Sequence, residues 1–124
     1  MQTESLIAEL LEMRKYYNSG ITRRYNFRRQ QLLTLREAIL RSETEFNRAL
    51  YKDLRKTPEE AWVTETGLLL QEINHTLKHL KQWMRPERVG TNLLNLPSVS
   101  YVHPSPKGVV LIIGTWNFPL QLLL

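Results

Sequence analysis

The sequence predicts an α/β fold in which helices come first and a buried strand of a parallel sheet comes last. Apolar residues at helical spacing, with repeated helix-start signals, run through about the first two-thirds of the chain. Residues 109–113 are then apolar without alternation, which is typical of a strand buried on both faces. We therefore expect a helical part over residues 1–97. An extended segment and the first strand of an incomplete parallel sheet should follow over residues 98–124.

The first two helices are predicted from apolar stripes. A stripe over residues 4–17 predicts an amphipathic helix, which Asn18, Ser19 and Gly20 should end. A second helix should open after Thr22. The residues of the first stripe are Leu6, Ile7, Leu10, Leu11 and Tyr17, and the expected buried residues of the second helix are Leu32, Leu35 and Ile39.

Capping signals predict two further helix starts. Ser42 is followed three residues later by a glutamate, which is the form of a capping box. Thr57 can cap another helix, because Pro58 stands at the first helical position and Glu60 at the third. This last helix should end before Pro86. Its apolar positions, at steps of three, four or seven, are Trp62, Leu69, Ile73, Leu77, Leu80 and Trp83.

An extended segment separates the helices from the apolar run. Residues 89–96 are irregular, whereas residues 98–103 alternate well enough to predict a short, half-exposed strand. A turn over residues 104–108 should lead into the buried strand, which Gly114 ends.

Composition narrows the classes of function only slightly. Hydrophobic content of 42% and charged content of 23% are ordinary for a globular protein. A net charge of +5 suits an acidic partner such as nucleic acid or a phosphate-bearing cofactor, and it equally suits solubility alone. The basic cluster Arg23, Arg24, Arg28 and Arg29, with Tyr25 and Phe27 interleaved, could hold nucleic acid. We favour a solvated helix start or a protein interface, and we expect no nucleic-acid partner.

Metal chemistry and disulfides are not expected. His75 and His79 stand one helical turn apart, but residue 76 is threonine where a zinc protease motif has glutamate, and no third ligand is evident. The chain contains no cysteine, so it has neither a disulfide framework nor a zinc–cysteine site.

The uncharged stretch 108–124 also admits a membrane-anchor interpretation, because its length is close to the lower limit for a membrane-spanning helix. Pro119, Asn117 and the β-branched residues of the stretch favour extended structure instead. We therefore prefer the strand.

The apolar run and the sequence Gly114-Thr115-Trp116-Asn117-Phe118-Pro119 resemble the first sheet strand and following loop of the aldehyde dehydrogenases, most closely the class 3 group. The resemblance covers nearly the whole chain from about Ser19 and implies helices, an oligomerisation segment and then the first strand of a Rossmann-like cofactor domain. Other matching features are Thr22-Arg23, Phe27-Arg28, Gln30-Gln31-Leu32, Ala49-Leu50, Asp53-Leu54 and Lys56.

The resemblance also implies roles for the loop. Asn117 would donate its side-chain amide N–H to the oxyanion that forms when a cysteine thiolate attacks the aldehyde. Ile113, Thr115, Trp116 and Asn117 would line the cleft for NAD or NADP. The alternatives are an asparagine that pins its own loop, and plain packing for Trp116. No Gly-x-Gly-x-x-Gly motif supports nucleotide binding independently.

In the family, the nucleophilic cysteine, the general-base glutamate and the remaining cofactor-binding residues lie downstream of this loop. We therefore expect an N-terminal segment of an NAD(P)-dependent aldehyde dehydrogenase that oxidises an aldehyde to a carboxylic acid. This segment would be inactive without the remainder of the catalytic chain, and the parent would be a cytoplasmic homodimer. The alternative is a small helical interaction module whose apolar C-terminal tail binds a membrane or a partner. A basic nucleic-acid-binding protein is a third possibility.

Overall fold

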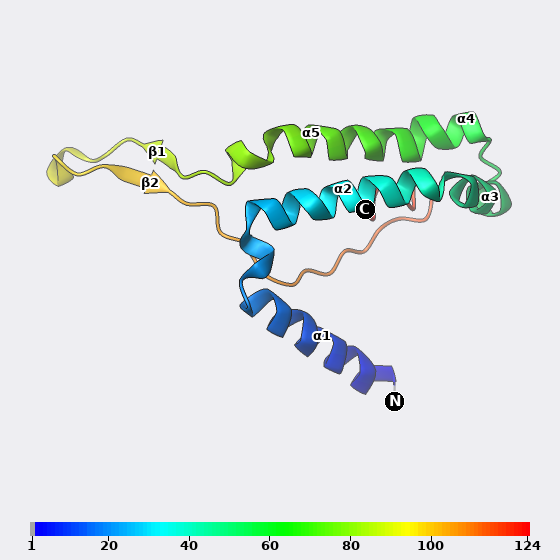
Figure 1. Ribbon diagram of the computed structural model, residues 1–124, viewed down its shortest axis with the longest axis horizontal. Helices are drawn as coiled ribbons and strands as arrows, with labels where there is room; N and C mark the ends of the chain where they lie inside the picture. Colours follow the sequence, from blue (N-terminus) through cyan, green and yellow to red (C-terminus); the bar gives the residue numbers. More distant parts are fainter. Residues whose placement is uncertain (1) are drawn as a thin grey trace.

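The computed structural model describes residues 2–124, with side chains from residue 5 onward, and it is mostly helical with one two-stranded sheet (Figure 1). The elements are α1 (Gln2–Asn18), α2 (Tyr25–Arg41), α3 (Glu43–Leu54), α4 (Pro58–Ala61), α5 (Gly67–Trp83), β1 (Glu87–Val89) and β2 (Ser100–Val102). Short 3-10 turns cover Ile21–Arg23 and Leu93–Asn95, and a π-helical turn over Trp62–Thr66 joins α4 to α5.

Helices α2 and α5 form the body of the structure. They lie side by side and run in opposite directions (Figure 1). Their contact buries Ile39 of α2 against Leu69, Leu70 and Ile73 of α5. The predicted buried sides are thus confirmed for these helices, with Leu32, Leu35 and Leu77 partly buried around the same cluster.

The predicted helix starts are confirmed, although one capping bond is not made. The Thr57 hydroxyl accepts a hydrogen bond from the Glu60 backbone N–H at 3.3 Å, and Pro58 is the first residue of α4. Ser42 occupies the N-cap position of α3 but makes no side-chain cap bond. Its backbone N–H instead bonds to the Ala38 carbonyl and ends α2, so one residue joins two helices.

The π-helical turn explains why the predicted stripe fails at its first residue. Trp62 was expected on the buried side, yet its side chain is 45% exposed. A π turn contains about one residue more than an α turn, so residues before it are rotated by roughly 100° relative to a regular helix. Trp83, at the other end of the stripe, is also exposed, because it lies in the last turn beyond the reach of the α2 core.

Gly67 makes the π turn possible. Its backbone N–H bonds to the Trp62 carbonyl five residues earlier. A Cβ atom at position 67 would lie 2.5 Å from that same carbonyl oxygen, a distance that a real Cβ does not tolerate. Glycine is therefore required at the residue that closes the turn.

Two parts project from the helical body (Figure 1). Helix α1 ends at Asn18, and two residues later the chain turns at Gly20, whose φ of 78° suits glycine. The α1 stripe residues Leu6 and Ile7 are exposed. The hydroxyl of Tyr17 donates to the Pro106 carbonyl at 2.8 Å, which ties the end of α1 to the C-terminal segment.

The second projection is the β1–β2 hairpin. Its strands pair antiparallel, with Glu87 opposite Val102 and Val89 opposite Ser100. The predicted strand over 98–103 is confirmed as β2, but the expectation of irregular structure from residue 89 is wrong at Val89. Val89 is in a strand because β1 pairs with β2 across the hairpin, and the local sequence pattern does not predict that pairing.

The predicted buried strand over residues 109–113 is not formed. The segment is extended in the figure but pairs with no other described residue, and Leu111 and Ile113 are 85% and 86% exposed. A strand requires a hydrogen-bonded neighbour, and the helical body presents no sheet edge to this segment. The expected fold class, helices followed by an extended segment and an incomplete sheet, is confirmed; among the described residues the 109–113 segment is extended but has no paired neighbour.

No helix among residues 2–124 is both long and apolar enough to cross a membrane. Residues 108–124, which raised the membrane-anchor interpretation, contain no helix.

Candidate functional site

The C-terminal segment returns to the helical body at the loop over residues 114–121, which we call the Asn117 loop (Figure 1). After Gly114 the chain forms a series of tight turns. One of these is closed by the Leu122 backbone N–H, which donates to the Phe118 carbonyl at 3.2 Å. The loop is thus an ordered structure beyond an extended segment that has no ladder partner.

Lys56 binds the first half of the Asn117 loop. It lies between the end of α3, where Arg55 takes a left-handed conformation with φ of 60°, and the N-cap of α4. Its ammonium donates to the Asn117 backbone carbonyl at 2.8 Å and lies 4.2 Å from the ring centroid of Phe118. Only 7% of the Lys56 residue is exposed.

Glu65 binds the second half of the loop. Its Oε2 accepts backbone N–H groups from Leu120 at 3.1 Å and Gln121 at 3.0 Å. Its Oε1 accepts from the Lys56 ammonium at 2.6 Å. Glu65 lies in the π-helical turn and is fully buried, with 0% exposed.

Lys56 and Glu65 therefore form one buried ion pair with the loop wrapped around it; we call it the Lys56–Glu65 anchor. Removing two charges from water is unfavourable unless the remaining donors and acceptors are satisfied. Here the loop backbone supplies those partners, because it offers a carbonyl to the cation and two N–H groups to the anion. The anchor and the loop consequently satisfy each other.

The four residues predicted to form a site lie on one continuous exposed stretch. Ile113, Thr115, Trp116 and Asn117 are all exposed, with Trp116 at 89%. The Asn117 carbonyl faces Lys56, while its side-chain amide makes no hydrogen bond within residues 5–124. In the described part of the chain the loop is thus pinned by the anchor and not by the asparagine side chain.

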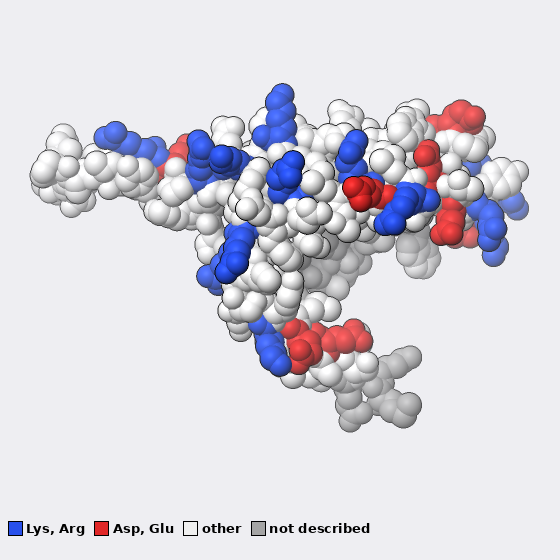
Figure 2. Space-filling view, viewed as in Figure 1, with Lys and Arg blue, Asp and Glu red and all other residues white. Residues whose placement is uncertain are grey.

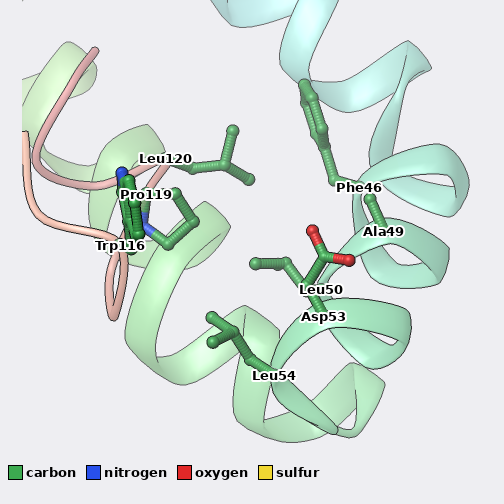
Figure 3. Close-up of a pocket in the computed structure, with 8 residues that line it drawn as sticks. All are labelled: Phe46, Ala49, Leu50, Asp53, Leu54, Trp116, Pro119 and Leu120. Atoms are coloured by element: carbon green, nitrogen blue, oxygen red, sulfur yellow. The ribbon is translucent and has the colours of Figure 1, made fainter.

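A cavity of about 520 Å³ lies between the Asn117 loop and α3. Figure 3 shows Trp116, Pro119 and Leu120 on its loop side, opposite Phe46 and Leu54. The lining is mainly apolar, with the Asp53 carboxylate as its charged member. The loop and α3 therefore form the two opposite walls of this cavity.

The other sequence candidates serve local structure. His75, His79 and Trp83 form an aromatic row along α5, and the ring centroids of the two histidines lie 4.2 Å apart. Among residues 2–124 no three or more His, Cys, Asp or Glu side chains are grouped to hold a metal ion.

The basic cluster near the start of α2 also makes local contacts. Arg28 donates to the Thr22 carbonyl at 2.8 Å, and the guanidinium of Arg23 lies over the Tyr17 ring. Figure 2 shows Lys and Arg spread along the face in view, with acidic groups between some of them. Arg23 and Arg28 thus make contacts within the chain itself.

One carboxyl near the anchor has a shifted pKa. Backbone hydrogen bonding at the start of α4, and then the Thr57 hydroxyl, hold the pKa of Glu59 below its ordinary value. Its carboxylate therefore stabilises the helix start that follows Lys56.

Comparison with known sequences decides the family. The sequence model of the aldehyde dehydrogenase family matches residues 19–124. This chain belongs to the aldehyde dehydrogenase family. It is 38% identical over 112 residues to the 4,4'-diaponeurosporen-aldehyde dehydrogenase of Staphylococcus aureus, a match that covers 90% of this chain and 24% of that protein. It is 40% identical over 116 residues to the dog protein named "Aldehyde dehydrogenase, dimeric NADP-preferring", with 93% and 26% covered.

A solved structure agrees with the sequence matches. The substrate-bound state of Staphylococcus aureus AldH superposes with a TM-score of 0.88 at 38% identity, and the match covers 94% of this chain and 26% of that chain. The chain thus spans about a quarter of the length of the relatives it matches. The resemblance to the class 3 group is confirmed, since relatives named as aldehyde dehydrogenase family 3 members match at similar identity.

Sequence reasoning did not identify the Lys56–Glu65 anchor. Lys56 was noted only as part of the family pattern, and Glu65 was not singled out. The sequence did contain a signal for Glu65. It stands in a series at steps of four whose remaining members, Ala61, Leu69 and Ile73, are all apolar. An acid on a buried helical stripe requires a cationic or hydrogen-bonding partner.

Proposed function

We propose that this chain supplies one wall of the active site of an NAD(P)-dependent aldehyde dehydrogenase, an oxidoreductase that converts an aldehyde to a carboxylic acid. Asn117 is the catalytic residue that the chain contributes. The thiolate nucleophile and the general base come from the part of the enzyme that corresponds to the other three-quarters of its relatives.

The role of Asn117 follows from the chemistry of thiolate addition to an aldehyde. A thiolate that attacks the aldehyde carbon leaves a full negative charge on the former carbonyl oxygen. A neutral amide N–H held in place beforehand stabilises that charge without reorganising. The Asn117 side chain is exposed and its backbone is fixed by the anchor, so the amide is accessible on a backbone that is held in place.

The cofactor would contact the same stretch. The exposed side chains of Ile113, Thr115 and Trp116 fit one apolar, accessible wall of a nucleotide cleft, and no phosphate-binding glycine loop accompanies them. When bound, NAD or NADP supplies the hydride acceptor for the oxidation. The chain's own residues orient that ligand and exclude water from one side.

One observation carries the proposal. The family match covers residues 19–124 and includes the Asn117 loop, which the Lys56–Glu65 anchor binds. An asparagine on a fixed, exposed loop meets the requirement for an oxyanion donor.

The test is a chimera in which this chain replaces the matching segment of Staphylococcus aureus AldH. We expect the chimera to oxidise aldehydes and Asn117→Ala to lower its kcat by about 10²–10³-fold. Asn117→Asp should be at least as damaging, because it places a negative charge beside the oxyanion. Cofactor binding, measured by quenching of protein fluorescence, should persist in both variants.

The matched control is Asn95→Ala, at an exposed asparagine near the tip of the β1–β2 hairpin. It should leave kcat unchanged. A folded Asn117→Ala chimera with the kcat of the parent chimera would refute the proposed role of Asn117.

We also propose that the complete enzyme is a homodimer; the name of the dog relative calls that protein dimeric. The hairpin supports this, because Tyr101 and Val102 of β2 are exposed on an arm that projects from the body. Light scattering of the chimera should give twice the protomer mass, and a monomeric chimera would contradict the proposal.

A further inference from the structure

We infer that Lys56 and Glu65 are positioning residues that hold Asn117 in the geometry required for catalysis. This inference rests on the proposed function of Asn117 and adds to it the residues that fix the loop. Lys56 lies between α3 and α4, 61 positions from the loop group that it binds. Glu65 lies in the π turn before α5, 55 and 56 positions from the two loop groups that it binds.

The contacts of Lys56 fix the residue that carries the donor. An ammonium has three N–H groups. Lys56 directs its ammonium to three partners: Glu65 Oε1 at 2.6 Å, the Asn117 carbonyl at 2.8 Å and the face of Phe118 at 4.2 Å from the ring centroid. Two of these belong to Asn117 and its neighbour, so movement of the Asn117 backbone would break a charge-assisted hydrogen bond.

The contacts of Glu65 fix the far side of the loop. Its Oε2 accepts from two successive backbone N–H groups, those of Leu120 and Gln121. Two successive N–H groups on one oxygen determine the direction of that backbone as well as its position. With Lys56 bound to the Asn117 carbonyl, the stretch from Asn117 to Gln121 is held at both ends.

Burial makes this arrangement stiff. Glu65 is fully buried and the Lys56 side chain is 9% exposed, so water cannot replace the loop groups without opening the structure. An oxyanion donor must be placed accurately, because a misplacement of about 1 Å in an active site can cost ~10² in rate. The anchor supplies that accuracy from outside the loop.

The test uses a double-mutant cycle in the chimera with Staphylococcus aureus AldH. Lys56→Met removes the ammonium and keeps a chain of similar length. We expect it to lower kcat by up to about 10²-fold when Asn117 is present. In the Asn117→Ala background the same substitution should lower kcat little further, because the group that it positions has gone.

A structural role alone would give a different result. Lost stability would be the same in both backgrounds, and its effect on kcat would be additive. The melting temperature is therefore measured alongside kcat, and Lys52→Met, at an exposed lysine in the last turn of α3, is the control. Additive effects of Lys56→Met and Asn117→Ala on kcat would overturn the inference.

The outcomes separate the inference from the function on which it rests. If Asn117→Ala leaves kcat unchanged, the proposed function fails and the inference fails with it. If Asn117→Ala lowers kcat and the cycle is additive, only the inference fails. If Lys56→Met is not recovered folded, the pair Lys56→Gln with Glu65→Gln removes both charges and enters the same cycle with the same expectations.

Discussion

Two adjacent stretches of the C-terminal segment are held in opposite ways. Residues 109–113 are strongly apolar, yet they are unpaired and largely exposed. The Asn117 loop is more polar, yet it makes three hydrogen bonds to the Lys56–Glu65 anchor. The difference shows that this end of the chain is attached to the rest of the structure by directed polar contacts and not by its most apolar stretch.

The physical reason lies in what each stretch needs as a partner. An apolar strand is satisfied by neighbouring strands and by covering side chains, and the described residues present neither to residues 109–113. A loop is satisfied by any donors and acceptors that match its backbone groups. One buried lysine and one buried glutamate are sufficient for that.

We expect the largest loss of folding stability from a substitution at Glu65. Glu65→Leu leaves the Lys56 ammonium buried without its counter-ion and leaves two backbone N–H groups unpaired. We expect the free energy of unfolding to fall by about 3–5 kcal/mol. Urea unfolding of the 124-residue chain, followed by circular dichroism, measures this value.

Glu72→Leu on the exposed side of α5 is the matched control and should change stability by no more than about 0.5 kcal/mol. Equal effects at the two glutamates would mean that the anchor does not hold the loop.

We expect the second-largest loss of folding stability at Gly67, which closes the π turn that carries Glu65. In Gly67→Ala the new Cβ meets the Trp62 carbonyl, so the turn must shift and displace Glu65 from the loop. We expect a loss of about 1–3 kcal/mol, read from the same urea transitions. Gly90→Ala is the control, since nothing lies within 4 Å of a Cβ there. A Gly67→Ala chain as stable as Gly90→Ala would show that the π turn is not required.

A smaller effect is expected at Thr57, the N-cap that follows Lys56. Thr57→Ala removes the acceptor for the Glu60 backbone N–H and should cost about 1 kcal/mol in thermal or urea unfolding. Thr34→Ala, at an exposed position within α2, should be neutral. If both substitutions have the same effect, the cap does not stabilise the start of α4.

The same cap predicts a pH dependence at Glu59. Its folded pKa is lowered, so the stability that it contributes is present above its ordinary pKa and is lost as the pH falls through the lowered value. In Thr57→Ala one of the two causes of the shift disappears, and the pKa of Glu59 should rise toward its ordinary value. A carbon-detected NMR titration of the carboxyl group measures this, and an unchanged pKa would exclude the hydroxyl as a cause.

We expect the smallest change in folding stability at Leu111, which lies in the unpaired stretch 109–113. Leu111→Lys should change the stability of the 124-residue chain by no more than about 0.5 kcal/mol, because the side chain is already 85% exposed. In the chimera the same substitution should reduce the soluble yield sharply, because the strand is expected to be buried there. A large loss in the chain alone would contradict the exposed arrangement.

Local signals predicted the helical part well. The Thr57 cap, the glycine that follows α1 and the apolar stripe of α2 depend on residues within one or two turns of each other, so short-range sequence is sufficient. Trp62 was placed wrongly because a five-residue π turn shifts the helical spacing. The hydrogen bond from the Gly67 N–H to the Trp62 carbonyl that marks this turn is visible only in three dimensions.

Contacts between residues far apart in the chain could not be predicted from the sequence. The partner of β2 lies across a hairpin, and the partners of the Asn117 loop lie more than fifty residues earlier. The loop itself was predicted as a site from the residues around Asn117, whereas the residues that hold it were not. Glu65 gave a local hint as an acid on an apolar stripe, but its complement Lys56 lies in a loop before α4 and follows no helical spacing.

Amide hydrogen exchange of the 124-residue chain is the measurement that shows whether the Lys56–Glu65 anchor holds the Asn117 loop. We expect slow exchange at Leu120 and Gln121, whose N–H groups are bound by buried Glu65, and fast exchange at Leu111 and Ile112. Glu65→Gln should speed exchange at the first two positions and leave the others unchanged. Equally fast exchange at all four positions in the unsubstituted chain would show that the anchor does not hold the loop.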